Sequence, residues 1–402
     1  MAKSALAWRS GWRVVARAID GLLWVFLGAA GGVSALASTA EKAASEGASS
    51  AAAGNSSAAS AASAASPVSV SRDRTWVSVP RTVGRITAAE IGVLINTNDP
   101  YSVEVGEFYI NARKLSAAQV LRIELPVKPA LTPEEFSALA AKIDAYFGER
   151  TQALALAWTL PYAVGCNSIT GALALGFDAA LCAQSCAPSR PSRYFNTATV
   201  KPFNDLKLRP SMLLAARDVA GAKALIERGV ASDRTLGLRG APAVHAHYLI
   251  TNDRVRSVRA ALFPPSGLLR RQGVDVHVDT QQTLDGASRL LLYQTGLTRV
   301  DKLDTLAWVP GAVADHLTSF GGRLDAKTGQ MSAVEWISSG ATASYGSVSE
   351  PCSHPQKFPH PQLLLLHYLQ GATVLEAYWK SVAWPQQGVF IGEPLAAPFA
   401  RR

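Results

Sequence analysis

The chain has 402 residues and a formal net charge of +9. Its basic residues form no runs, so this modest charge indicates an ordinary solvated surface, and we predict no nucleic-acid partner. The sequence has no phosphate-binding glycine loop, no G-x-S-x-G and no H-E-x-x-H, which excludes nucleotide enzymes, common esterases and common zinc proteases as leading interpretations.

The first 37 residues have the order of an export signal. Four basic residues precede residues 21–37, which carry no charge and consist mainly of Leu, Val, Ala and Gly. Ala35-Leu36-Ala37 has the small-x-small pattern that signal peptidases cleave, so we expect cleavage after Ala37. An uncleaved membrane anchor is the alternative, although these seventeen residues fall short of the roughly 20 that cross a bilayer.

Residues 38–66 are almost entirely Ala and Ser. Such a stretch has few side chains to bury, so we predict a disordered linker there. Residues 67–402 then form one large α/β domain or two closely packed lobes, because single cores usually stop growing at roughly 250–300 residues. No later apolar run approaches the first in length, so we predict no membrane span after cleavage. We expect the protein in the periplasm or at the cell surface.

Apolar runs alternate with segments of helical periodicity along the domain. The predicted strands cover residues 91–96, 120–125, 153–159, 244–250, 274–278, 290–293, 341–346 and 388–392. Helices are predicted from Pro100 onward, from the capping box at Thr132 onward, over residues 218–228 up to Gly229, and over residues 363–369 and 374–379. This alternation predicts an α/β fold with a mostly parallel sheet and helices on both faces.

Ligands of such sheets bind beyond the carboxyl ends of the strands. We therefore expect a cleft walled by the loops after Asn96, Thr159, Tyr293, Pro310 and Gly346. The polar residues that follow the first strand are better explained as turn and helix-cap residues than as a site. A glutamate that follows the last strand either faces this cleft or simply ends the sheet.

The four cysteines are Cys166, Cys182, Cys186 and Cys352, and an exported protein can keep disulfides. Three pairings are open to four cysteines. The short spacing favours a bridge between Cys182 and Cys186, which leaves Cys166 and Cys352 to pair or stay free.

The segment from Gly311 to Gly322 gathers Asp315, His316 and Ser319 with a glycine pair. These residue types can form a general base beside a nucleophile, and the glycines suggest close backbone approach. The alternative, to which we give equal weight, is that His316 is a buried histidine with a structural role.

The segment from Gly340 to Pro361 runs from a small-residue strand into a proline-rich loop that carries Glu350, Cys352, His354, Lys357 and His360. Prolines stiffen a loop at low entropic cost, which holds side chains for binding. Cys352 fits either a thiolate nucleophile or half of a disulfide. The spacing matches no standard zinc-ligand pattern, so we predict no metal ion and no cofactor.

The segments INTNDPYSVEVGEFY, WTLPYAVGCNSITGALALGFD, PGAVADHLTSFGG, GATASYGSVSEPCSHPQKFPHP and EAYWKSVAWPQQGVFIGEPLA resemble one uncharacterised family of exported bacterial proteins. They span Ile95 to Ala396, nearly the whole domain. That family is similar to proteins whose genes accompany the exosortase system, which sorts proteins at the cell envelope. The resemblance implies a cell-envelope setting.

The strand ending in Gly392-Glu393-Pro394 and the Gly-Ala-rich strand from Gly340 to Gly346 are similar to those of gingipain-type peptidases. This resemblance implies a caspase-like fold, with a flavodoxin-like fold as the alternative. The catalytic His of that family follows a strand at a position that resembles Gln294-Thr295-Gly296 here, and its catalytic Cys position falls near His316 to Ser319. Neither residue type stands where that dyad requires it.

Two functions are therefore expected. The first is a hydrolase or transferase acting on an envelope peptide or glycan, with His316 as base, Ser319 or Cys352 as nucleophile and Asp315 or Glu350 as orienting acid. The second is a non-catalytic binding or assembly module, for an envelope peptide, protein or glycan, that kept the fold and lost the dyad. The oligomeric state stays open.

Overall fold

The computed structural model describes residues 74–325 and 328–401. The predicted signal segment, its cleavage after Ala37 and the linker over residues 38–66 lie outside the described residues. The strands are β1 Ile91–Asn96, β2 Val120–Ile123, β3 Ala130–Leu131, β4 Ala153–Leu156, β5 Ala163–Val164, β6 Asn167–Ser168, β7 Ser211–Leu213, β8 Val244–Ile250, β9 Gly267–Leu269, β10 Val274–Thr280, β11 Leu290–Gly296, β12 Trp308–Leu317, β13 Ala343–Ser347 and β14 Gly388–Gly392.

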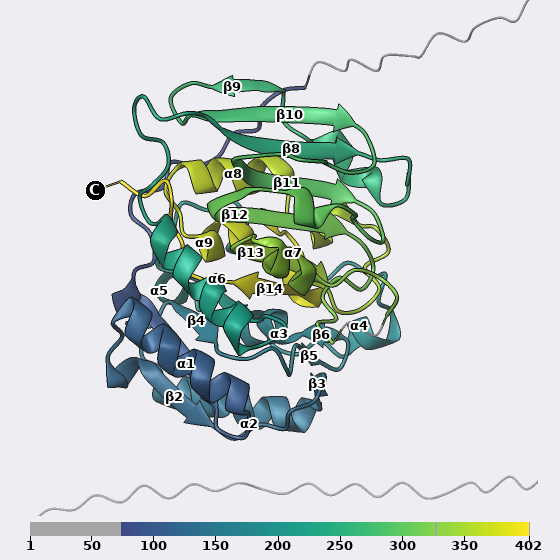
Figure 1. Ribbon diagram of the computed structural model, residues 1–402. Helices are drawn as coiled ribbons and strands as arrows, with labels where there is room; N and C mark the ends of the chain where they lie inside the picture. The colour runs from purple at the N-terminus through teal and green to yellow at the C-terminus, as the bar shows by residue number, and fades with distance from the viewer. Residues whose placement is uncertain (1–73, 326–327, 402) are drawn as a thin grey trace, which may run out of the picture. The chain divides into compact units, whose positions relative to one another are not determined.

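Eleven of these strands form one sheet in the order β2-β1-β4-β7-β14-β13-β12-β11-β8-β10-β9 (Figure 1), and β3, β5 and β6 form a small second sheet. Neighbours in the main sheet run parallel except for β13 with β14 and β9 with β10. Every residue of β1, β4, β11 and β14 is buried, as expected for strands covered on both faces. The predicted α/β fold with a mostly parallel sheet is confirmed.

The helices are α1 Pro100–Arg113, α2 Pro133–Tyr146, α3 Ile169–Leu175, α4 Ala180–Ala183, α5 Pro202–Leu206, α6 Val219–Ser232, α7 Ala333–Ser339, α8 Pro361–Leu369 and α9 Val374–Ser381. Helices α6 and α7 lie in front of the main sheet in Figure 1, and α8 and α9 lie behind it. Among residues 74–325 and 328–401, no helix is both long and apolar enough to cross a membrane.

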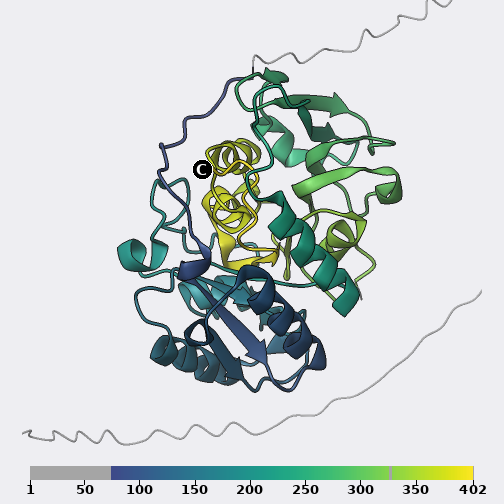
Figure 2. The ribbon, with the colours of Figure 1, turned by 60° about the vertical axis from the view of Figure 1, so that its left-hand side comes forward.

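An irregular segment, residues 74–87, passes alongside α8 and α9 (Figure 2). The Thr82 N–H donates to Gln370 Oε1 at 2.8 Å, and the Ile86 N–H donates to Glu376 Oε2 at 3.2 Å. Polar side chains of α9 and of the C-cap of α8 therefore satisfy the backbone of a segment that has no strand partner of its own.

Helix starts follow the sequence closely. Pro100 opens α1 with Asp99 as its cap, since the Asp99 carboxylate accepts from the Tyr101 N–H at 3.0 Å. Thr132 closes a capping box with Glu135 at the start of α2. Asn96 is also structural, because its side-chain amide holds the backbone of Leu125 through two hydrogen bonds.

The predicted end of α6 at Gly229 is wrong, because α6 continues to Ser232. A β-carbon at Gly229 would press on the Glu393 side chain, at 2.6 Å from its Cβ. Glu393 is fully buried and pairs there with Arg113 of α1, whose Nε and Nη2 donate to it at 2.9 and 2.6 Å. Gly229 therefore makes room for a buried ion pair, and Glu393 does not line a cleft.

The glycines around β13 do mark a close backbone approach, as the sequence suggested. A β-carbon at Gly346 would overlap the backbone of Gly321 and Gly322, and one at Gly322 would overlap the backbone of Gly346. Neither Gly346 nor Gly322 therefore has room for a side chain.

We expect Gly346→Ala to lower the free energy of unfolding by about 1–3 kcal/mol, because the added methyl forces these backbones apart. Gly148→Ala is the matched control, since nothing lies within 4 Å of its β-carbon position. Denaturant unfolding followed by tryptophan fluorescence measures both, and equal stability of the two variants would contradict the packing described here.

Candidate functional site

A cleft of about 360 Å³ lies where several distant segments meet. Its polar lining includes Ser332, the N-cap of α7, and also Asp99, Tyr101, Thr159, Arg217, Asp325 and Glu335. Asp99, Tyr101, Thr159 and Arg217 follow the carboxyl ends of β1, β4 and β7, and Asp325 and Glu335 lie before and within α7. We call this the acidic cleft. Of the five loops expected to wall a cleft, those after Asn96 and Thr159 contribute to its lining.

Hydrogen bonds hold Tyr101 and Asp325 in place at the acidic cleft. The Tyr101 hydroxyl donates to the Leu214 carbonyl at 2.8 Å and accepts from the Ala216 N–H at 2.9 Å. Burial raises the pKa of Tyr101 to about 12, so its side chain lines the cleft in the neutral form. Asp325 accepts from the Tyr162 hydroxyl at 3.1 Å.

Carboxylates outnumber cations in the acidic cleft. Asp99, Asp325 and Glu335 face one guanidinium, that of Arg217, which pairs with Glu335. Burial raises the pKa of Asp99. Leu160 and Val334 add apolar surface between the charges. Such a lining complements a cation that has an apolar stem.

Asp315 and His316 do not act on each other. They are consecutive residues of β12 and so point to opposite faces of the sheet. On one face, the Arg259 guanidinium donates to Asp315 at 2.5 Å and the Gln294 amide donates to its other oxygen at 2.7 Å. On the other face, Trp336 of α7 donates its indole N–H to His316 Nδ1 at 2.9 Å.

His316 is fully buried, and burial, followed by the positive charge of Arg259, lowers its pKa to about 3. An efficient general base has a pKa near the working pH, so this imidazole is poorly tuned for that role. Ser319 lies half-buried in the turn after β12, and its carbonyl accepts from the Ser347 hydroxyl at 3.0 Å. In the described part of the chain, no hydrogen bond joins His316 to Ser319.

The predicted Cys182–Cys186 bridge is wrong. The disulfides are Cys166–Cys182 and Cys186–Cys352. Cys182 belongs to α4 and faces the β5–β6 turn, whereas Cys186 follows α4 and faces the proline-rich loop. Short spacing did not decide the pairing, because the two side chains point to different elements.

These disulfides include all four cysteines of the sequence, so none offers a thiolate. Cys352 is therefore not a nucleophile in this state, and Glu350 only accepts from its backbone N–H, at 2.7 Å. The other polar residues of that loop are also structural. Lys357 donates to the Ser185 carbonyl at 2.6 Å, and His360 caps α8.

The two strand ends that the peptidase resemblance singled out lie side by side, since Thr295 of β11 is opposite His316 of β12. The end of β11 is covered, however. A β-carbon at Gly296 would overlap the backbone of Arg256. The Arg256 side chain reaches over to the Thr318 hydroxyl at 3.4 Å. Arg256 thus packs against the ends of both strands.

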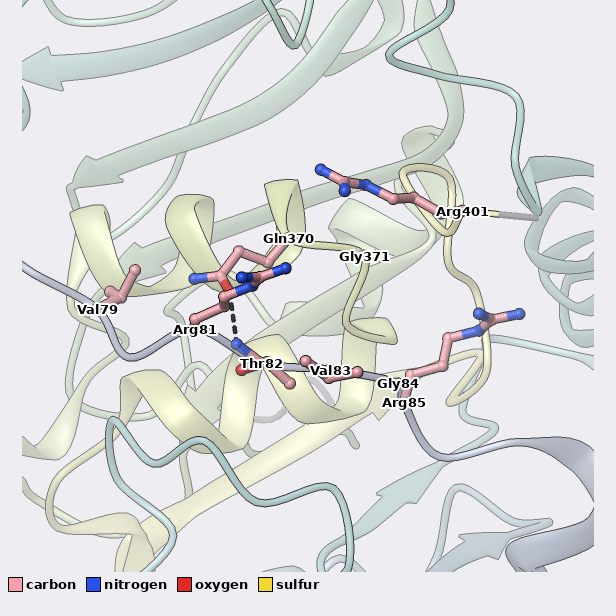
Figure 3. Close-up of a pocket in the computed structure, with 9 residues that line it drawn as sticks. All are labelled: Val79, Arg81, Thr82, Val83, Gly84, Arg85, Gln370, Gly371 and Arg401. Atoms are coloured by element: carbon pink, nitrogen blue, oxygen red, sulfur yellow. Dashed lines mark hydrogen bonds between the residues drawn. The ribbon is translucent and has the colours of Figure 1, made fainter.

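A larger hollow, about 550 Å³, is lined by residues 79–85, the end of α8 and Arg401 (Figure 3). Of its three arginines, Arg81 and Arg401 are exposed and Arg85 is half-buried. The Gln370 amide oxygen already accepts from the Thr82 N–H (Figure 3). Among the residues that the structure describes, these arginines have no buried polar side chain beside them to hold them in place for a ligand. The smaller acidic cleft is therefore the better candidate.

Within residues 74–325 and 328–401, one group of side chains could hold a metal ion: His245 and His247 of β8 with His277 of β10. Sequence reasoning missed it. The available signal was an H-x-H pair on one predicted strand and a D-x-H-x-D run on the next, but only the pairing of β8 with β10 brings the three together.

No family model and no curated protein matches the chain. Among solved structures, the crystal structure of the Arg-specific cysteine proteinase gingipain R is similar over 79% of this chain and 79% of that one, with a TM-score of 0.38 and 11% sequence identity. At this similarity, the comparison assigns neither an activity nor site residues to this chain.

Proposed function

We propose that this chain is a non-catalytic binding module whose acidic cleft takes up a cationic group, such as a lysine or arginine side chain of an envelope peptide or protein. The supporting observation is the convergence of Asp99, Asp325 and Glu335 on one cleft. Asp99 is far along the chain from the other two, and the chain carries a net positive charge overall. A local excess of negative charge in a basic protein favours a cationic ligand.

The residues of the alternative, a hydrolase or transferase, are occupied elsewhere. Asp315 is bound by Arg259 and Gln294, His316 is bound by Trp336, and Cys352 is in a disulfide. Glu350 accepts from the Cys352 N–H, and in the described part of the chain no hydrogen bond joins Ser319 to a histidine that could act as its base. These observations favour the binding module over the enzyme.

The proposed location is the periplasm or the cell surface. Two disulfides support an oxidising compartment, because such bonds persist there and are rare in the cytosol. The signal-like first 37 residues support the same location.

The test uses a fluorescein-labelled tetra-arginine peptide and the full chain, with binding followed by fluorescence anisotropy. We expect the double variant Asp325→Asn/Glu335→Gln to weaken binding by about tenfold or more, since each hydrogen bond to a charged group contributes roughly 1.5–3 kcal/mol. Glu149→Gln is the matched control, because its side chain is 80% exposed and lies outside the cleft. Equal losses in the two proteins, or equal binding of a tetra-glutamate peptide, would contradict the proposal.

The same preparation tests the alternative with envelope peptides and glycans as substrates. Product formation that Ser319→Ala abolishes would overturn the non-catalytic assignment. Uptake of the tetra-arginine peptide without turnover of any substrate supports it.

A further inference from the structure

Three histidines share one face of the sheet near its β9 edge. His245 and His247 are two residues apart on β8, so their side chains point the same way. His277 of β10 stands directly opposite His247 in the parallel register. Figure 1 shows α6 and α7 in front of other strands of the sheet and not in front of β8 and β10. All three imidazoles are half-buried, which leaves them within reach of solvent.

The three rings lie at ligating distances. His245 Nδ1 and His277 Nε2 are 3.0 Å apart, and the rings of His247 and His277 stack with centroids 4.4 Å apart. One nitrogen from each histidine lies within 4.8 Å of the other two. Zinc–nitrogen bonds of about 2.0–2.1 Å place tetrahedral nitrogens roughly 3.4 Å from one another. Small rotations of these side chains therefore suffice to surround one ion.

Two carboxylates lie close to the rings. Asp279 Oδ2 is 3.9 Å from His247 Nδ1, and Asp275 Oδ2 is 3.5 Å from His277 Nε2. In the described part of the chain, His247 Nδ1 is buried without a hydrogen-bond partner. Metal-binding histidines commonly have a carboxylate as the partner of their second nitrogen, which fixes the ring, and Asp279 can take this role for His247. Asp275 instead lies beside the His277 nitrogen that faces His245, where a fourth ligand would stand. A buried nitrogen without a partner is also costly, and a ligand or a shifted carboxylate removes that cost.

We propose that His245, His247 and His277 bind one zinc ion that links β8 to β10. Three imidazoles suit zinc and its transition-metal neighbours, whereas magnesium and calcium prefer oxygen ligands. The fourth position is open to water or to Asp275. This site is separate from the acidic cleft, shares no residue with it and does not depend on the function proposed for it.

The experiment is calorimetric titration of the full chain with zinc chloride, after removal of any affinity tag and treatment with a chelator. Non-reducing conditions keep all four cysteines in disulfides, so that thiolates do not compete for zinc. We expect one equivalent to bind. His247→Ala should weaken binding by more than the roughly 10- to 100-fold lost with an outer-sphere partner, and Asp279→Asn by about tenfold. Cobalt(II) should give the visible absorption of a tetrahedral ion.

His354→Ala is the matched control, because it removes a histidine that packs against Trp384 outside the cluster. Circular dichroism shows whether each variant is folded. Should His247→Ala unfold the chain, His245→Gln at a less buried position carries the same test. Retention of one equivalent of zinc in a folded cluster variant, an equal loss in His354→Ala, or no zinc binding by the folded parent chain would each overturn the proposal.

Discussion

Arg259→Met should lower the free energy of unfolding by about 3–5 kcal/mol, the usual cost of leaving one partner of a buried ion pair without the other. Arg259 and Asp315 are 1% and 0% exposed, and the guanidinium also donates to the Thr295 and Pro359 carbonyls at 3.0 and 3.2 Å. The variant keeps much of the apolar volume but leaves Asp315 as a buried charge. Denaturant unfolding followed by tryptophan fluorescence measures the loss.

Arg256→Met is the matched control for Arg259→Met. Arg256 pairs with Asp253 at 2.8 Å, but both side chains are more than one-fifth exposed, so this pair contributes about 1 kcal/mol or less. Adding Asp315→Asn to Arg259→Met should recover part of the lost stability, because it removes the uncompensated charge. Equal losses for the two arginines, with no recovery in the double variant, would contradict a structural role for the Arg259–Asp315 pair.

The role of Asp315 shows why strand β12 was not predicted. Strands such as β1 and β14 are continuous apolar runs, so the sequence predicts their bounds. In β12, Asp315 and His316 interrupt the apolar pattern although both are buried. Their burial depends on Arg259 and Trp336, which come from other elements, and no local pattern reveals such partners.

The acidic cleft is hard to predict from the sequence for the same reason. Asp99 reads as an ordinary helix cap, and it is one, while Asp325 and Glu335 read as solvent-exposed acids. Their common lining depends on the strand order, which brings the loops of β1, β4 and β7 against the start of α7. The sequence predicts each element and each polar loop, but the strand neighbours decide which loops meet.

Loss of the disulfides should also lower the free energy of unfolding strongly. The double variant Cys186→Ser/Cys352→Ser should lower the free energy of unfolding by roughly 5 kcal/mol and Cys166→Ser/Cys182→Ser by roughly 3 kcal/mol, on the chain-entropy relation between stabilisation and loop length. The first bridge joins residues 166 positions apart and the second joins residues 16 apart. Denaturant unfolding of both variants without reductant measures the difference.

The long bridge also attaches the proline-rich loop to the turn after α4, beside the Lys357 bond to the Ser185 carbonyl. Loss of that bridge should leave tetra-arginine binding unchanged under conditions where the variant is folded, because neither Cys186 nor Cys352 lines the acidic cleft. If a stable variant loses peptide binding or an activity toward a substrate, Cys352 instead has a role in the functional site. Lost stability with intact binding assigns this cysteine to the fold.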